Sequence, residues 1–139
     1  MRRKLCVGWL VQSNDFNLAS VRYRCHHMAA GLRAHGVESR VTGDPNALAR
    51  ALDEFDAVVI VKRLDEGARK LAIDTRSRRK AVILDLCDDI ISGRYRPDGS
   101  PGNLAALGAM APFLSCVVAT GPMLAARLKQ VLPSGVPVC

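Results

Sequence analysis

The sequence predicts an α/β fold in which about six strands form a doubly wound parallel sheet, with helices on both faces. Short apolar segments alternate with segments of helical periodicity along the whole chain. Hydrophobic residues make up 49% of the chain but aromatic residues only 4%, so aliphatic side chains must build the core. Continuous aliphatic runs are typical of parallel strands that are buried on both faces. At 139 residues, we expect one domain spanning 1–139.

Six segments are predicted as strands because each is a short apolar run bounded by turn residues or charges. In chain order they cover residues 5–11, 37–42, 57–61, 81–86, 116–119 and 136–138. The third, fourth and fifth are almost wholly aliphatic, which favours burial in the middle of the sheet.

Five helices are expected between these strands. Ser20 is predicted to cap the first, in which apolar residues recur with a 3.6-residue period. Asp44 followed by proline opens the second, and the third carries its apolar face over 64–75. Asn103 and Thr120 are the expected caps of the last two. The stretch 87–102 is rich in proline, glycine and charge, so we expect a long loop, which in a compact domain is often functional.

Strands that alternate with helices require right-handed crossovers and a parallel sheet. The commonest order of a Rossmann-like sheet is 3-2-1-4-5-6, which reverses direction between the first and fourth strands. Ligands bind beyond the carboxyl ends of the strands at such a reversal. The sequence therefore predicts a site where the loop 12–20 meets the segment that starts at Asp85.

The first of these loops carries candidate ligands for an acceptor molecule or an anion: Ser13, Asn14, Asp15 and Ser20. Arg22 and Arg24 follow in what we expect to be the first helical turn, where the helix dipole disfavours cations. A bound anion would remove that conflict by accepting hydrogen bonds from both guanidinium groups. In the alternative, the two arginines point to solvent or pair with nearby acids.

The second segment offers Asp85, Asp88 and Asp89, of which Asp88 and Asp89 are the candidate catalytic residues. Carboxylates at a strand end can bind Mg²⁺, act as a general base or hold substrate hydroxyls. Alternation along an extended chain aims Asp88 and Asp89 apart, so no metal site is expected. We expect one carboxylate to orient Arg22 or Arg24 and another to contact a polar acceptor. In the alternative, Asp88 or Asp89 caps a short helical turn at 90–91.

Lys62 ends the third predicted strand and Thr120 ends the fifth, so both border the same edge of the sheet. Each is a candidate for the acceptor or anion site. The alternative roles are a solvated charge for the lysine and a helix cap for the threonine.

Composition argues against several classes of function. Five cysteines are scattered without a C-x-x-C pair, which favours free thiols in a reducing, cytoplasmic setting over disulfides or zinc. The net charge of +7 lies largely in runs without interleaved aromatics, so no specific nucleic-acid partner is expected. No apolar run is long enough to span a bilayer. No G-x-G-x-x-G follows the first strand, which argues against a dinucleotide cofactor.

Three segments resemble motifs of bacterial glycosyltransferases of the GT-B fold, in particular the family 4 or group 1 type. The run 19–24 is similar to their S-x-R-Y-R segment, and 82–89 is similar to their D-x-D-D strand and loop. The run 115–125 resembles their A-D-x-V-x-x-S-T-x-x-L-A segment.

This resemblance implies the acceptor-binding, N-terminal Rossmann-like half of a two-domain enzyme that moves a sugar from a nucleotide-sugar. The nucleotide-sugar would be a co-substrate held by a missing C-terminal Rossmann-like domain, without which this half is inactive. No metal or other cofactor is implied. The expected partners are that second domain, a sugar or a lipid- or protein-linked acceptor, and weak peripheral contact with a membrane, and the isolated domain is expected to dimerise.

The residues bear on two other functions. One is a free-standing, non-catalytic α/β module that binds a phosphorylated ligand or a protein partner. The other is a phospho-accepting receiver domain, which needs acidic residues after the first strand and an aspartate after the third. The sequence disfavours a receiver because Lys62 and Arg63 stand after the third strand.

Overall fold

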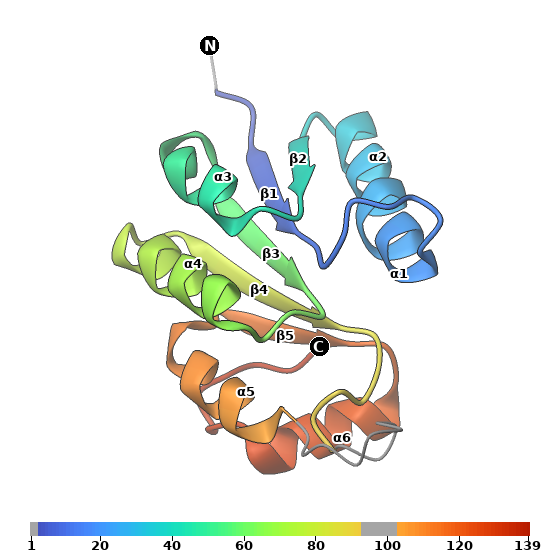
Figure 1. Cartoon of the computed structure of the whole chain (residues 1–139), viewed down its shortest axis with the longest axis vertical. Helices are drawn as coiled ribbons and strands as arrows, with labels where there is room; N and C mark the ends of the chain where they lie inside the picture. Colours follow the sequence, from blue (N-terminus) through green and yellow to red (C-terminus); the bar gives the residue numbers. More distant parts are fainter. Residues whose placement is uncertain (1–2, 93–102) are drawn as a thin grey trace.

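A computed structural model describes residues 3–92 and 103–139 of the chain. Its centre is one parallel sheet of five strands, in the order β2-β1-β3-β4-β5 (Figure 1). The strands are β1 (Cys6–Leu10), β2 (Glu38–Thr42), β3 (Ala57–Val61), β4 (Ala81–Leu86) and β5 (Cys116–Ala119). The predicted α/β fold with a parallel sheet is therefore confirmed, and the bounds predicted for β3, β4 and β5 match those observed.

Helices connect the strands. After β1 come α1 (Ala19–Val21), a π-helical turn (Arg22–His26) and α2 (His27–Ala34), which form one continuous helical segment. The other α-helices are α3 (Pro45–Arg50), α4 (Glu66–Ser77), α5 (Leu104–Met110) and α6 (Pro122–Val131). Single 3₁₀ turns follow α3 at Leu52–Glu54 and α5 at Ala111–Phe113.

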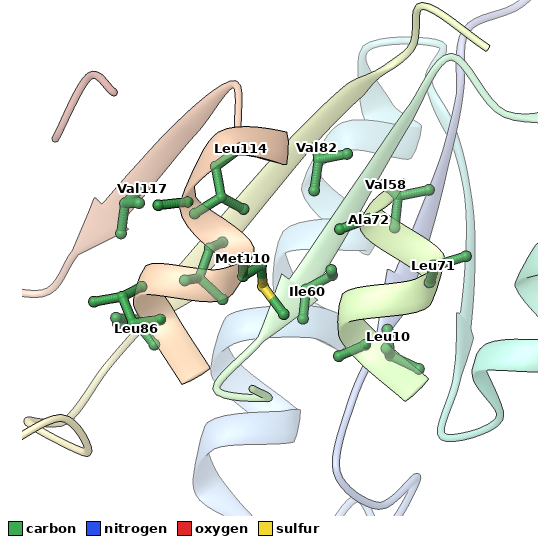
Figure 2. Close-up of a cluster of buried hydrophobic side chains, with 14 of the residues drawn as sticks. Leu10, Val58, Ile60, Leu71, Ala72, Val82, Leu86, Met110, Leu114 and Val117 are labelled. Atoms are coloured by element: carbon green, nitrogen blue, oxygen red, sulfur yellow. The ribbon is translucent and has the colours of Figure 1, made fainter. Parts of the chain in front are cut away.

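The two faces of the sheet are covered unequally. The larger core takes its helical side chains from α3, α4, α5 and α6, as Figure 2 shows for α4 and α5. Its largest fully buried members are aliphatic or aromatic, among them Phe55, Leu10, Ile60, Leu84 and Met110. The smaller core joins the segment α1–α2 to the other face, through Val21 and Cys25 against Trp9 and Val61. Burial of this much apolar surface is the main stabilising term for such a domain.

The predicted strand order is wrong. β1 pairs with β2 on one side and with β3 on the other, and β4 pairs with β3 rather than with β1. The direction of the sheet therefore reverses between β1 and β3, which is the flavodoxin-like order 2-1-3-4-5. Nor does 136–138 form a sixth strand within the described chain, because only an isolated parallel bridge joins Val138 to Val117.

Helix capping is confirmed in part. Asp44 accepts a hydrogen bond from the backbone N–H of Asn46, as predicted for α3. Ser20 lies inside α1 and is not its cap, because the helix already begins at Ala19. Thr120 is not the cap of α6 either, since Gly121 holds that position. Asn103 stands at the start of α5, but its side-chain amide donates to the carbonyl of Ile90.

The loop predicted for 87–102 lies only partly within the described residues, which end at 92 and resume at 103. In the described ranges no helix combines the length and the apolar character needed to cross a membrane.

Candidate functional site

The carboxyl end of β3 is tied to the ends of the neighbouring strands through Lys62 and Arg63. Lys62 follows the strand directly and adopts a left-handed backbone conformation with φ of 53°. Its backbone N–H donates to the carbonyl of Asp85 at 2.8 Å, and its ammonium group pairs with the carboxylate of Asp88. The hydrogen bond to Asp88 raises the pKa of Lys62, so the lysine is firmly cationic. A fixed positive charge therefore stands at the end of β3.

Arg63 ties three elements of this edge together. Its guanidinium donates to the backbone carbonyls of Val11 at 3.1 Å and of Gly43 at 2.7 Å, which follow β1 and β2. The same group pairs with Asp65, whose carboxylate also accepts from the N–H of Ala68 and caps α4. The hydrogen bond from Arg63 is the main cause that lowers the pKa of Asp65. Arg63 thus holds the strand ends together, and the carboxylate of Asp65 compensates its charge.

A pocket of about 1230 Å³ opens at this edge, between the strand ends and the start of α6. Its lining combines polar, charged and apolar side chains, including Gln12, Lys62, Asp88, Asp89, Asn103 and Arg127. Gly121 caps α6 without a side-chain hydrogen bond, and the first turn of this helix has no acidic residue. Met123 and Leu124 of that turn line the pocket, so the positive end of the α6 dipole borders it.

Arg24 and Asp85 form an ion pair on the face of the sheet that α1–α2 covers. A guanidinium nitrogen lies 2.7 Å from a carboxylate oxygen, with 26% of the arginine side chain and 10% of the aspartate side chain exposed. Burial raises the pKa of Asp85, and the charge of Arg24 and its hydrogen bond oppose that effect. The structure thus joins the two distant segments that the sequence analysis paired, with Asp85 orienting Arg24. Neither residue is among those that line the pocket.

The loop after β1 does not supply the pocket with the polar groups expected of it. Ser13 accepts from the N–H of Asp15, and Asp15 accepts in turn from the N–H of Asn17, so both side chains shape the turn. Asn14 is exposed, and Ser20 is half-buried within α1. These residues lie outside the pocket lining, whereas Gln12 lies within it.

The remaining candidates have local partners. Asp89 accepts from both the backbone N–H and the hydroxyl of Ser92, so it caps a turn, as the structural alternative predicted. The hydroxyl of Thr120 donates to the carbonyl of Cys87 at 3.0 Å, which joins the end of β5 to the loop after β4. Arg22 turns outward, with its guanidinium over the ring of Tyr23.

The possible metal ligands and the thiols of the described residues are as follows. Within residues 3–92 and 103–139, no cluster of three or more His, Cys, Asp or Glu side chains could hold a metal ion. All five cysteines are free. Burial raises the pKa of Cys87, and it raises that of Cys25 to about 12. Both thiols are therefore protonated near neutral pH and poor nucleophiles.

Sequence reasoning placed Gln12 in the loop 12–20 and Arg63 directly after the third strand but proposed neither as a site residue, and it missed Arg127. Gln12 and Arg127 line the pocket, and Arg63 binds the strand ends together. The position of Gln12 directly after β1, at the observed reversal, was the one available signal. Nothing in the sequence distinguishes Arg127 from other helical arginines, because its place depends on how α6 packs.

No protein-family profile matches the chain. No curated protein matches it either. Among solved structures, it resembles the Vibrio cholerae chemotaxis protein CheY4, with a TM-score of 0.52 and 12% sequence identity. That match covers 94% of this chain and 100% of the other.

This comparison corrects the family resemblance. The structural neighbour is a CheY-like receiver domain with five parallel strands, and the prediction of a GT-B glycosyltransferase domain is wrong. The partners that this resemblance implied are therefore wrong as well: the nucleotide-sugar, the missing C-terminal domain, and the sugar or lipid- or protein-linked acceptor. The free-standing module for a phosphorylated ligand or a protein partner gains no support from the comparison. At 12% identity the likeness establishes a receiver-like fold and no more.

Proposed function

We propose that the chain is a regulatory domain of receiver architecture that responds to a small anion held noncovalently, in place of a phosphoryl group on aspartate. The observation that carries this proposal is Lys62, a fixed cation at the end of β3 beside a pocket. A phospho-accepting receiver needs an aspartate at that position. The fold shared with a chemotaxis protein is what supports the regulatory part of this proposal.

Phosphoryl capture does not fit the described residues. The position after β3 is basic, and the loop after β1 has one carboxylate, Asp15, which is engaged in its own turn. No acidic cluster in the described ranges could hold a divalent ion. Without a metal to neutralise it, a phosphoryl group has little to favour its transfer to a carboxylate here.

A bound anion fits the same edge better. Lys62 and Arg127 line the pocket, and the start of α6, which has no side-chain cap, adds the positive end of a helix dipole. Asp65 and Asp89 also line it, but each carboxylate accepts a backbone N–H in its own turn. Asp88 is the present partner of Lys62, with 58% of its side chain exposed. The Lys62 side chain is 25% exposed, so the pair is exposed on the side of Asp88, where a ligand anion can compete with this carboxylate for the lysine.

The test is a titration followed by thermal unfolding and by amide NMR shifts. Inorganic phosphate and acetate, each tried separately, are the probes, and saturation with a weakly binding anion should raise Tm. A free ligand at 100 times its Kd stabilises by about 2.7 kcal/mol. We expect Lys62→Met combined with Arg127→Met to abolish the response. Arg50→Met is the control, because Arg50 is exposed on α3, away from the pocket. An unchanged response in the double variant would refute the site.

A second measurement addresses the phosphoryl group directly. Incubation with acetyl phosphate and Mg²⁺ should leave the chain at its unmodified mass. A stable gain in mass that hydroxylamine removes would reveal an acyl phosphate, and would show that a carboxylate of the chain does accept phosphate.

A further inference from the structure

Aromatic and cationic side chains gather on the outer side of the segment that follows β1. Arg22 lies over the ring of Tyr23 at 4.8 Å and over that of Phe16 at 6.0 Å. The ring of His26 lies 5.3 Å from that of Phe16, and the ring of His27 lies 5.2 Å from that of Tyr23, edge to face. These five residues form one connected group, which we name the aromatic–cation patch.

The patch faces solvent with large side chains. Tyr23 is 56% exposed and Phe16 is 51% exposed, and the neighbouring Leu18 and Met28 are exposed as well. Large exposed apolar groups that gather at one place mark interaction surfaces more often than scattered ones do. In Figure 1 this segment, α1–α2, lies to one side of the sheet, away from α5 and α6. The patch is thus separate from the pocket.

The charge of this region is of one sign. No aspartate or glutamate occurs between Asp15 and Glu38, while three arginines and three histidines do. Of these arginines, Arg24 is neutralised by Asp85. Arg22 has no ion pair among the described residues, and its side chain donates only a long hydrogen bond, of 3.5 Å, to the carbonyl of Phe16. The patch therefore presents a cation without an internal counter-charge.

We infer that the aromatic–cation patch is a docking surface for an acidic segment of a partner protein that also carries an aromatic or aliphatic side chain. Tyrosine and arginine are enriched among the residues that dominate protein interfaces. The aromatic and histidine rings already contact one another, so little side-chain freedom is lost on binding. An acidic partner would supply the missing counter-charge to Arg22.

An anionic membrane is the weaker candidate for the same surface. Lipid-binding segments of this kind carry clusters of about four to eight lysines or arginines. Arg22 is the one arginine within the patch, and the patch contains no lysine. The inference does not depend on the proposed function, because no patch residue lines the pocket.

The experiment selects peptides from a random dodecapeptide phage library on the immobilised domain. The binding of the selected peptides is then measured by fluorescence anisotropy. The test variant is Arg22→Ala with Tyr23→Ala. The control is Arg50→Ala with Leu104→Ala, which removes the same charge and a similar exposed apolar area elsewhere. Circular dichroism establishes that both variants fold.

We expect selected peptides rich in Asp and Glu with at least one aromatic or aliphatic residue. Their binding should weaken at least tenfold in the patch variant, stay within twofold in the control and fall with added salt. Peptides without acidic residues, or equal binding by the two variants, would overturn the inference. Binding to phosphatidylserine vesicles that the patch variant loses, without an acidic peptide motif, would assign the surface to a membrane and also overturn it.

Discussion

The guanidinium of Arg24 and the carboxylate of Asp85 meet at 2.7 Å where the segment α1–α2 crosses the sheet. Both side chains are largely withdrawn from solvent, and the Nε of Arg24 has no hydrogen-bond partner among the described residues. The pair is thus a polar contact beside the apolar residues of this junction, such as Val21 and Cys25. It fixes the helical segment to β4, and its energetics can be measured.

Removing one partner of this pair should destabilise the fold strongly. Arg24→Met or Asp85→Leu leaves the other charge poorly solvated, and we expect a loss of about 3 kcal/mol, the lower end for buried pairs. Chemical denaturation measures the loss. The double variant should recover most of it, because apolar side chains of similar volume replace a buried pair at little cost. If both single variants unfold at the same denaturant concentration as the parent, the ion pair does not anchor the segment.

The carboxylate of Asp65 should make stability depend on acid pH. The hydrogen bond from Arg63 lowers the pKa of Asp65 below its ordinary value of 3.8. Since the folded pKa lies below the unfolded one, the stabilisation is complete above about pH 5 and is lost as pH falls through the folded pKa. Asp65→Asn should therefore flatten the acid limb of a plot of unfolding free energy against pH. A limb of unchanged slope in this variant would contradict the assignment.

The left-handed backbone at Arg79 predicts a stabilising substitution. Arg79 has φ of 58° just after α4, a position at which glycine is favoured. Arg79→Gly should stabilise by about 1 kcal/mol, which thermal unfolding would show as a higher Tm. Arg79→Ala keeps the strain and is the matched control. Equal Tm values for the two variants would mean that this backbone conformation has no cost.

Two glycines should respond in opposite ways to alanine. A Cβ at Gly8 would lie 3.1 Å from Leu48 and 3.3 Å from Phe55, so Gly8→Ala should overpack the core at a cost of about 1 kcal/mol. At Gly108, inside α5, nothing lies within 4 Å of the added atom. Gly108→Ala should stabilise by about 0.5 kcal/mol through helix propensity. Denaturation midpoints that shift in the same direction would contradict this packing account.

The sequence predicts where the strands lie along the chain better than it predicts their order in the sheet. The runs Ala57–Val61 and Ala81–Leu86 are recognisable because both faces of each are buried, which requires continuous aliphatic residues. The side chains of a buried strand do not determine which other strand pairs with it. The order 3-2-1-4-5-6 is the commonest one for such a sheet, and the observed pairing of β3 with both β1 and β4 differs from it. Where the sheet reverses therefore emerged only from the structure.

The site residues that directly follow a strand were predictable from the sequence. Those on a helix were not, because their direction depends on how the helix is rotated about its own axis. Lys62, Asp85 and Asp88 come together because parallel strands bring their carboxyl ends to one edge. Arg22 and Arg24 are two residues apart, yet one lies outside on Tyr23 and the other is paired with Asp85. No local sequence signal tells which of the two arginines turns inward.

That choice belongs to the π-helical turn at Arg22–His26, where the N–H of His27 reaches back five residues to the carbonyl of Arg22. Each residue of an α-helix advances the chain by about 100° around its axis, so the wider turn resets the phase of everything after it. The rotation of this segment about its axis therefore determines two features together: Arg24 points toward the sheet, and the rings of Tyr23 and His27 point away from it. Deleting one residue from this turn would rotate α2 about its axis relative to the sheet. We expect this to separate Arg24 from Asp85 and to move His26 and His27 away from the rings of Phe16 and Tyr23.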